Sequence, residues 1–168
     1  MPTNKKEFDS LAGFSVDQVS VVDENRNAKD LNTLEVKNRF YSDSKNTTYI
    51  LRGANTATLA LDDVGTAIPI ENSTVNFITG HFLASNPSGV VYSGKIESSV
   101  TCDGNGAVSI LSSMLTIIKH DVPVGESWDI DTFSSANRFS YNVIRTGTTQ
   151  VIKWVVSTQV VSIAWAWC

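Results

Sequence analysis

The sequence predicts an all-β protein: an antiparallel β-sandwich or jelly-roll preceded by an N-terminal docking arm, in which a short helix is an option. From Gly53 onward, apolar residues recur with a period of two, the spacing typical of half-buried strands. Turn sequences separate these segments at short intervals, as they do in sandwiches and jelly-rolls. Beyond Gly53, no 3.6-residue apolar stripe extends over three helical turns.

The composition excludes several classes of protein. The chain has 168 residues, a formal net charge of −4 and only 18% charged residues. An acidic balance argues against a nucleic-acid partner, which requires a basic surface. The first residues, "MPTNKKEF", are too polar for a signal peptide, and no apolar run approaches the roughly 18 residues of a membrane span. We therefore expect no membrane insertion, and synthesis in a cytoplasm.

Charged residues are concentrated in the first third of the chain. Residues 1–52 hold 16 of the 30 Asp, Glu, Lys and Arg residues, and residues 53–168 hold the other 14. This break predicts a charged arm over 1–52 and a β-sandwich domain over 53–168. Within the arm, "FDSLAGF" places Phe8 and Leu11 on one side of a short helix. So short a helix is marginal in water and is expected to dock on another surface.

The segment "VVYSGKIESSVTC" carries the clearest strand pattern. Four of its apolar residues share one face: Tyr92, Ile96, Val100 and Cys102. Polar residues alternate with them, which is typical of an antiparallel strand with one wet face. "NPSG" before it and "DGNG" after it are turn sequences, and the second predicts a hairpin into "AVSILSSMLTIIKHDV". "DGNG" also begins like a calcium loop, but its glycine spacing does not fit one.

The last segment, "QVIKWVVSTQVVSIAWAWC", changes its apolar parity. Trp154 and Val156 are apolar at even positions, whereas Val161, Ile163 and Trp165 are apolar at odd positions. A one-residue slip swaps the faces of a strand, so a bulge or corner near residues 157–159 is predicted. The alternative is a single strand that is buried on both faces.

No constellation of residues indicates an enzyme. Cys102 with His81 or His120 is the only nucleophile pair to consider, and the two cysteines fit no metal or redox spacing. Four aspartates, Asp62, Asp103, Asp129 and Asp131, are the carboxylates by which a small hydrolase would be tested. None of the usual catalytic or phosphate-binding motifs occurs. We therefore expect a non-enzymatic protein with no catalytic residues, no metal and no cofactor.

Large apolar side chains near both ends are candidates for a subunit interface. Trp165 and Trp167 lie on one side of an extended strand, and each indole buries on the order of 200 Å² when covered. One interpretation places them in the core of the sandwich. The other places them against a second copy, together with residues of the arm. The candidate interface residues are Phe8, Leu11, Phe14, Trp165 and Trp167.

The stretch "FDSLAGFSVDQVSVVDENRNAKDLNTLEVKN" resembles the N-terminal segments of virion structural proteins of tailed bacteriophages, and the likeness covers roughly residues 7–60. The resemblance implies a virion component, commonly a homotrimer, whose N-terminal segment attaches to the particle. N-terminal segments of this kind occur in tail-fibre proteins, in baseplate-associated proteins and in head-decoration proteins. An alternative is a carbohydrate-recognising module that binds a host glycan through Tyr92, Trp128 or Tyr141, if these rings are exposed.

Overall fold

The computed structural model describes residues 14–16, 19–22, 28, 31 and 33–165. The expected arm helix, with Phe8 and Leu11, lies outside the described residues, and so does Trp167. The chain divides into two compact units, residues 1–32 and residues 33–168. The second unit contains the sandwich.

All described elements are β-strands, which confirms the predicted all-β class. The strands are β1 (Phe14–Val16), β2 (Val19–Val22), β3 (Thr33–Lys37), β4 (Ser44–Ala54), β5 (Ala57–Thr58), β6 (Ile68–Pro69), β7 (Thr74–Ser85), β8 (Val91–Cys102), β9 (Val108–His120), β10 (Ser127–Ser135), β11 (Arg138–Thr146) and β12 (Lys153–Ala164). In the first unit, β1 and β2 form an antiparallel pair, and Phe14 begins β1.

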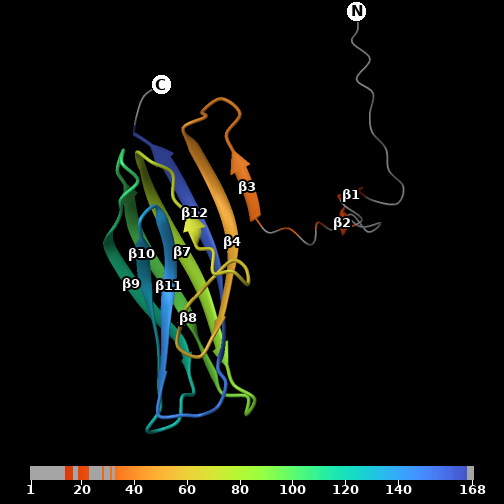
Figure 1. The fold of residues 1–168 in the computed structure, drawn as a ribbon, viewed down its shortest axis with the longest axis vertical. Coiled ribbons are helices and arrows are strands. Elements are labelled where there is room, and N and C mark those ends of the chain that lie inside the picture. The colour runs from red at the N-terminus through yellow and green to blue at the C-terminus, as the bar shows by residue number, and fades with distance from the viewer. Residues whose placement is uncertain (1–13, 17–18, 23–27, 29–30, 32, 166–168) are drawn as a thin grey trace, which may run out of the picture. The chain divides into compact units, whose positions relative to one another are not determined.

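The larger sheet of the second unit has six antiparallel strands in the order β3-β4-β12-β7-β8-β9. Figure 1 shows the long strands of this sheet side by side, with β12 between β4 and β7. The "DGNG" turn joins β8 to β9 as predicted: Asp103 Oδ1 accepts the backbone N–H groups of Asn105 and Ala107, both at 2.8 Å. Gly106 has a φ of 87°, which glycine adopts without strain.

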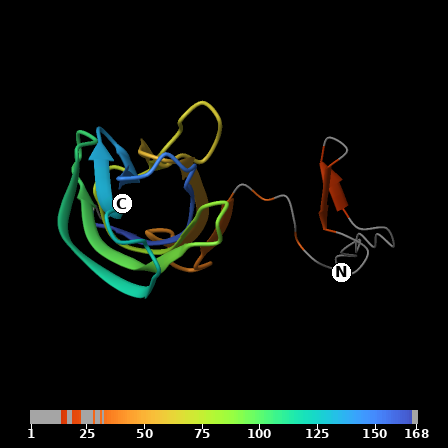
Figure 2. The same cartoon turned by 90° about the horizontal axis from the view of Figure 1, so that it is seen from below.

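The smaller sheet consists of β10, β11 and β5, and β6 also pairs with β11. In Figure 2, the larger sheet forms a curved wall, and the β10–β11 hairpin lies on its concave side. The predicted sandwich is therefore confirmed. We call the face of the larger sheet toward the smaller one its inner face and the opposite face its outer face.

Aromatic side chains from both sheets meet in the core. Trp128 of β10 and Trp154 of β12 are buried, with ring centroids 6.5 Å apart. Tyr141 of β11 is also buried, and Thr158 of β12 donates its hydroxyl to the Tyr141 oxygen at 3.3 Å. Because aromatic rings carry the largest apolar area per residue, these contacts hold the two sheets together.

Tyr141 approaches the larger sheet at a glycine. A Cβ atom on Gly80 of β7 would lie 2.4 Å from the Tyr141 hydroxyl oxygen and 2.9 Å from a methyl carbon of Val156. Both distances are far below van der Waals contact. Gly80 is therefore the point at which the backbone of β7 makes room for the tyrosine ring.

The composition break near Gly53 falls inside a strand. Residues 44–54 form the single strand β4, and Leu51 of this strand is buried opposite Val156 of β12. The last residues of the charged segment thus belong to the sandwich, because their alternate side chains complete its core. The docking role of residues 1–52 stays a prediction.

The predicted bulge near residues 157–159 is wrong. β12 pairs without a register shift with β4 and with β7 from Lys153 to Ile163. The even positions face the core throughout, and two of them, Thr158 and Ser162, are buried polar residues. The strand does not need to swap faces, because Val161 and Ile163 at odd positions lie on the outer face and remain exposed. The alternative of a strand buried on both faces is wrong for the same reason.

Candidate interaction surface

The outer face of the larger sheet carries a contiguous group of exposed apolar side chains on its two central strands. In the register of β12 with β7, Val161 lies opposite Phe77 and Ile163 lies opposite Val75. Trp165 follows β12, and its backbone N–H donates to the Ser73 carbonyl at 3.0 Å, which continues the ladder. We call this group the outer-face cluster: Val75, Phe77, Val161, Ile163 and Trp165.

Members of the outer-face cluster are between 40% and 52% exposed. Since full burial of an aromatic side chain covers about 150–250 Å², the cluster leaves on the order of 400–500 Å² of apolar surface in water. That is as large as the largest apolar patch on a typical monomer, roughly 300–600 Å², and such patches are often functional.

Polar residues border the outer-face cluster on both sides. Across β12, the neighbours of Ile163 and Val161 on β4 are Ser44 and Asn46. Across β7, the neighbours of Val75 and Phe77 on β8 are Thr101 and Ser99. An apolar patch with a polar rim has the anatomy of a protein–protein contact.

Of the five candidate interface residues, the structure describes the side chain of one. Trp165 is 46% exposed and lies at the end of the outer-face cluster. Phe14 belongs to the other compact unit. Val75 and Phe77 were not predicted as surface residues, because an alternating apolar strand gives no sign of which of its faces the partner sheet covers. That Trp165 joins a subunit contact stays a prediction.

Residues considered for nucleophilic catalysis are far apart. Cys102 ends β8, whereas His120 pairs with Tyr92 at the other end of that strand. At about 3.3 Å per residue, the ten residues between them span roughly 33 Å. His81 pairs with Lys95, also far along β8, and it lies on the outer face. Burial, followed by the nearby Asp103 charge, raises the pKa of the Cys102 thiol, which disfavours the thiolate.

The four aspartates considered for a hydrolase do not converge. Asp62 accepts hydrogen bonds within its own turn, and Asp103 does so in the β8–β9 turn. Asp129 and Asp131 lie two residues apart on β10, where each is bonded to a neighbouring hydroxyl or backbone group. Within the described ranges, no group of three or more His, Cys, Asp or Glu side chains is placed to hold a metal ion, and no helix could cross a membrane.

The rings proposed for glycan recognition are not available at the surface. Tyr92, Trp128 and Tyr141 are all buried, with at most 3% of each side chain exposed. Each packs in the aromatic core, where the ring centroids of Tyr92 and Trp154 lie 6.1 Å apart. A sugar platform built on these three residues is therefore excluded.

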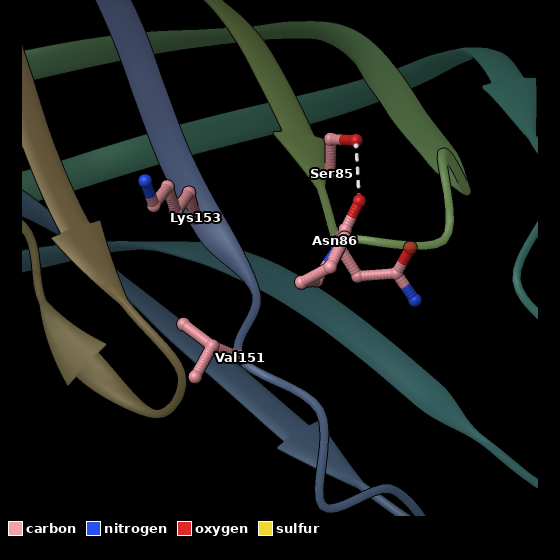
Figure 3. Close-up of a pocket in the computed structure, with 5 residues that line it drawn as sticks. Ser85, Asn86, Val151 and Lys153 are labelled. Carbon is pink, nitrogen blue, oxygen red and sulfur yellow. Dashed lines mark hydrogen bonds between the residues drawn. The ribbon is translucent and has the colours of Figure 1, made fainter.

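A cavity of about 390 Å³ lies where β7 ends and β12 begins (Figure 3). Its wall includes Ser85, Asn86, Val151 and Lys153. The Ser85 hydroxyl donates to the Asn86 carbonyl at 3.4 Å, and Asn86 Oδ1 accepts the backbone N–H groups of Ser88 and Val90. These polar atoms hold the turn, and Figure 3 shows the Lys153 side chain pointing away from it. Nothing in this cavity indicates a ligand.

The described part of the chain thus presents a β-sandwich whose most prominent surface feature is apolar and uncharged. No protein-family model matches the sequence, and no curated protein does. A similar solved structure is the tailspike protein gp49 from Acinetobacter baumannii bacteriophage Fri1, a capsular polysaccharide depolymerase. The two share 13% sequence identity with a TM-score of 0.40 over 81% of this chain and 20% of the tailspike chain.

The matched structure is that of a phage tailspike protein. The expectation that the chain is not an enzyme is contradicted by the same finding, because the matched protein is a depolymerase, and the expectation is withdrawn. The chain spans 20% of that tailspike's length, and the depolymerase activity is a property of the tailspike.

Proposed function

We propose that this chain is a component of a tailed-phage virion, associated with the tail, that works as a homo-oligomer. The part of the charged segment that precedes β3, residues 1–32, attaches it to the particle. The outer-face cluster joins the sandwiches of neighbouring copies, expected to number three. The observation that carries the proposal is the outer-face cluster with its polar rim. The resemblance of residues 7–60 to phage virion proteins supports the assignment to a virion.

Burial of the outer-face cluster supplies enough free energy for association. At about 25 cal/mol/Å², covering it stabilises an oligomer by on the order of 10 kcal/mol per copy before losses are subtracted. The loss of translational and rotational freedom costs about 4–15 kcal/mol. The association of two or three copies through this face is therefore favoured by a modest net free energy. We expect single substitutions in the contact to weaken it measurably.

Light scattering coupled to size exclusion tests this proposal on the full chain at micromolar concentration. We expect the native mass to be a multiple of three copies. Phe77→Ser and Ile163→Ser are expected to lower the mass, since they remove exposed apolar area without touching the core. Ile144→Ser is the matched control, because Ile144 is 48% exposed on β11, in the smaller sheet. A monomeric native chain would overturn the proposal, and so would an oligomer that both cluster variants leave unchanged.

A head-decoration role is the alternative position on the particle. The two positions are separated by the neighbours of the gene: flanking tail genes support the tail, and flanking capsid genes support the head. Electron microscopy of particles labelled with antibody against residues 33–168 provides the direct measurement. Label on the capsid would replace the tail assignment by the decoration role.

A further inference from the structure

Strand β9 is the last strand of the larger sheet and has one unpaired edge. The sheet order ends in β7-β8-β9, and β9 pairs with β8 along its length from Val108 to His120. Among the described strands, none pairs with its other edge. A long edge strand presents a row of backbone N–H and C=O groups that can pair with another chain.

The side chains of β9 do nothing to protect this edge. No charged residue occurs from Val108 to Ile118. The exposed apolar residues, 39% to 75% accessible, are Leu111, Met114, Leu115, Ile117 and Ile118. Monomeric proteins usually guard an edge strand with charge, proline, short length or β-bulges. From Val108 to Ile118, β9 has bulges but neither charge nor proline, and the strand is 13 residues long.

The opposite edge of the same sheet is guarded in the usual way. β3 has only five residues, and two of them are Glu35 and Lys37. Glu35 pairs with Lys37 at 3.1 Å and with Lys45 of β4 at 3.2 Å. The two edges of one sheet therefore differ, and the difference indicates that the β9 edge is covered.

The smaller sheet leaves the middle of β9 uncovered. At the start of the strand, Val108 donates its backbone N–H to the Ala136 carbonyl at 3.0 Å. Farther along, Leu115 and Ile117 are paired with the inner-face residues Ile96 and Gly94, yet both stay about 40% exposed. The sandwich is thus open along the β9 flank, on its inner as well as its outer face.

We propose that β9 pairs antiparallel with β9 of a second copy, about a two-fold axis at Met114, so that the larger sheets of two copies become continuous. This contact goes beyond the outer-face association, because it uses a different surface and does not depend on the phage particle. Met114 is the midpoint of Val108–His120, so this register pairs the strand on both sides of the axis, except at Val108, whose N–H is bonded to Ala136.

The faces of β9 are symmetric about Met114, as a two-fold axis requires. Residues directly opposite in an antiparallel pair point to the same side of the sheet. In this register, the outer-face residues Ser112 and Ser109 lie opposite Thr116 and Lys119, which are also on the outer face. The inner-face residues Ser113 and Val108 lie opposite Leu115 and His120, which are also on the inner face.

The two bulges of β9 leave this match of faces intact. β8 pairs Ser99 with Ser112 and Val100 with Ile110, and it pairs Ser93 with Lys119 and Gly94 with Ile117. Leu111 and Ile118 are therefore the extra residues, one on each side of Met114. Because each bulge shifts the alternation by one residue, the symmetry of faces extends over both halves of the strand.

The area that β9 offers fits a second copy. Exposed fractions of this size on five side chains of about 150–200 Å² correspond to roughly 500 Å² from each copy. Both copies together reach about 1,000 Å², to which the paired backbones add, near the lower end of the 1,200–2,000 Å² of specific interfaces. The stretch from Val108 to Ile118 carries no charge that could select a foreign partner, whereas a second copy supplies the same apolar surface.

Engineered disulfides test the register directly, in a Cys168→Ser background that removes the terminal thiol. Met114→Cys is expected to form a covalent dimer under oxidising conditions, because Met114 faces itself across the axis within the 4.4–6.8 Å Cα separation of a disulfide, about the spacing of opposite strand residues. Ser109→Cys alone is expected to stay uncrosslinked. The double variant with Ser109→Cys and Lys119→Cys is expected to crosslink, because these positions lie opposite each other.

Charge on the edge gives the second measurement. Leu111→Lys and Ile118→Lys are expected to halve the native mass of whatever assembly the unmodified chain forms, with Ile144→Lys as control. Crosslinking of Met114→Cys should persist when Phe77→Ser removes the outer-face association. The β9 contact and the outer-face contact are therefore tested independently of each other. The inference is overturned if Met114→Cys stays uncrosslinked, or if both lysine variants keep the native mass.

Discussion

Val161 of β12 lies directly opposite Phe77 of β7 on the outer face of the larger sheet, and each side chain is about half exposed. On the inner face of the same two strands, Val160 lies opposite Ile78, and both are buried. One pair of strands therefore carries apolar residues on both faces, but the sandwich covers only one of them. The uncovered pair is the centre of the proposed contact between copies.

Fluorescence of Trp165 is expected to report this contact. Dilution that dissociates the oligomer should shift the emission to longer wavelength, because the half-exposed indole then meets water. Trp165→Phe should lose most of this shift. Trp154→Phe is the control, since Trp154 is buried in the single chain and its environment does not change on dissociation. A shift that survives Trp165→Phe in full would place the contact elsewhere.

Substitution of Gly80 is expected to push the two sheets apart. In Gly80→Ala, the added methyl group would overlap the Tyr141 hydroxyl, so we expect a loss of about 1–3 kcal/mol in the free energy of unfolding. Urea denaturation monitored by circular dichroism measures it. Gly104→Ala is the control, because its nearest contact is the Ser73 hydroxyl oxygen at 3.7 Å. That variant should stay within about 0.5 kcal/mol of the unmodified chain.

Removal of the Tyr141 hydroxyl tests the same contact from the other side. Tyr141→Phe alone should destabilise by about 0.5–1.5 kcal/mol, because Thr158 loses its buried acceptor. In the Gly80→Ala background, the same change should cost less or restore stability, since the closest overlapping atom is gone. A double-mutant cycle gives this coupling. Strictly additive effects of the two substitutions would show that the Tyr141 hydroxyl does not depend on the space that Gly80 leaves.

The two core tryptophans are expected to respond differently to phenylalanine. Trp128 Nε1 donates to Glu126 Oε2 at 3.0 Å, whereas the buried Trp154 Nε1 has no hydrogen-bond partner in the part of the chain that the structure describes. Trp154→Phe removes an unpaired polar atom, which offsets part of the lost packing. We expect it to destabilise by about 1–3 kcal/mol less than Trp128→Phe in urea denaturation. Equal losses would indicate that the Trp154 N–H is satisfied.

Protonation of Asp62 is expected to weaken its turn in acid. The Thr66 hydroxyl, followed by the backbone N–H groups of Thr66, Val64 and Gly65, holds the pKa of this carboxyl below its ordinary value. Its stabilising effect is therefore present above the ordinary pKa and is lost as the pH falls through the lowered one. Thr66→Val should raise the Asp62 pKa toward its ordinary value in a carbon-detected NMR titration. An unchanged midpoint would show that the backbone groups suffice.

Local patterns predicted the strands and turns of the sandwich. On β8, the four residues expected on one face, Tyr92, Ile96, Val100 and Cys102, are all buried. The "DGNG" turn closes as a hairpin because Asp103 satisfies the backbone groups that the turn leaves unpaired. These features depend on side-chain alternation and turn geometry, which are properties of a few consecutive residues.

The prediction of a bulge in β12 was wrong because burial in this strand depends on long-range packing between the two sheets. The apolar residues do change from even positions at Trp154 to odd positions at Val161. This change reflects an exposed apolar surface on the outer face, and the register of the strand does not slip. Whether an apolar position is core or surface depends on how far the smaller sheet extends over the larger one. Short-range alternation carries no information about that coverage, and this is why Phe77 and the β9 edge were not foreseen as exposed.

By itself, the sequence determined the all-β class, the strand segments from residue 74 onward and the turns that connect them, because alternation and turn chemistry are local. Only the tertiary structure decided that Trp165 and its neighbours remain in contact with water and that β9 ends its sheet without a partner. Those facts depend on strand order and on the extent of the covering sheet, which arise from contacts between residues far apart in the chain.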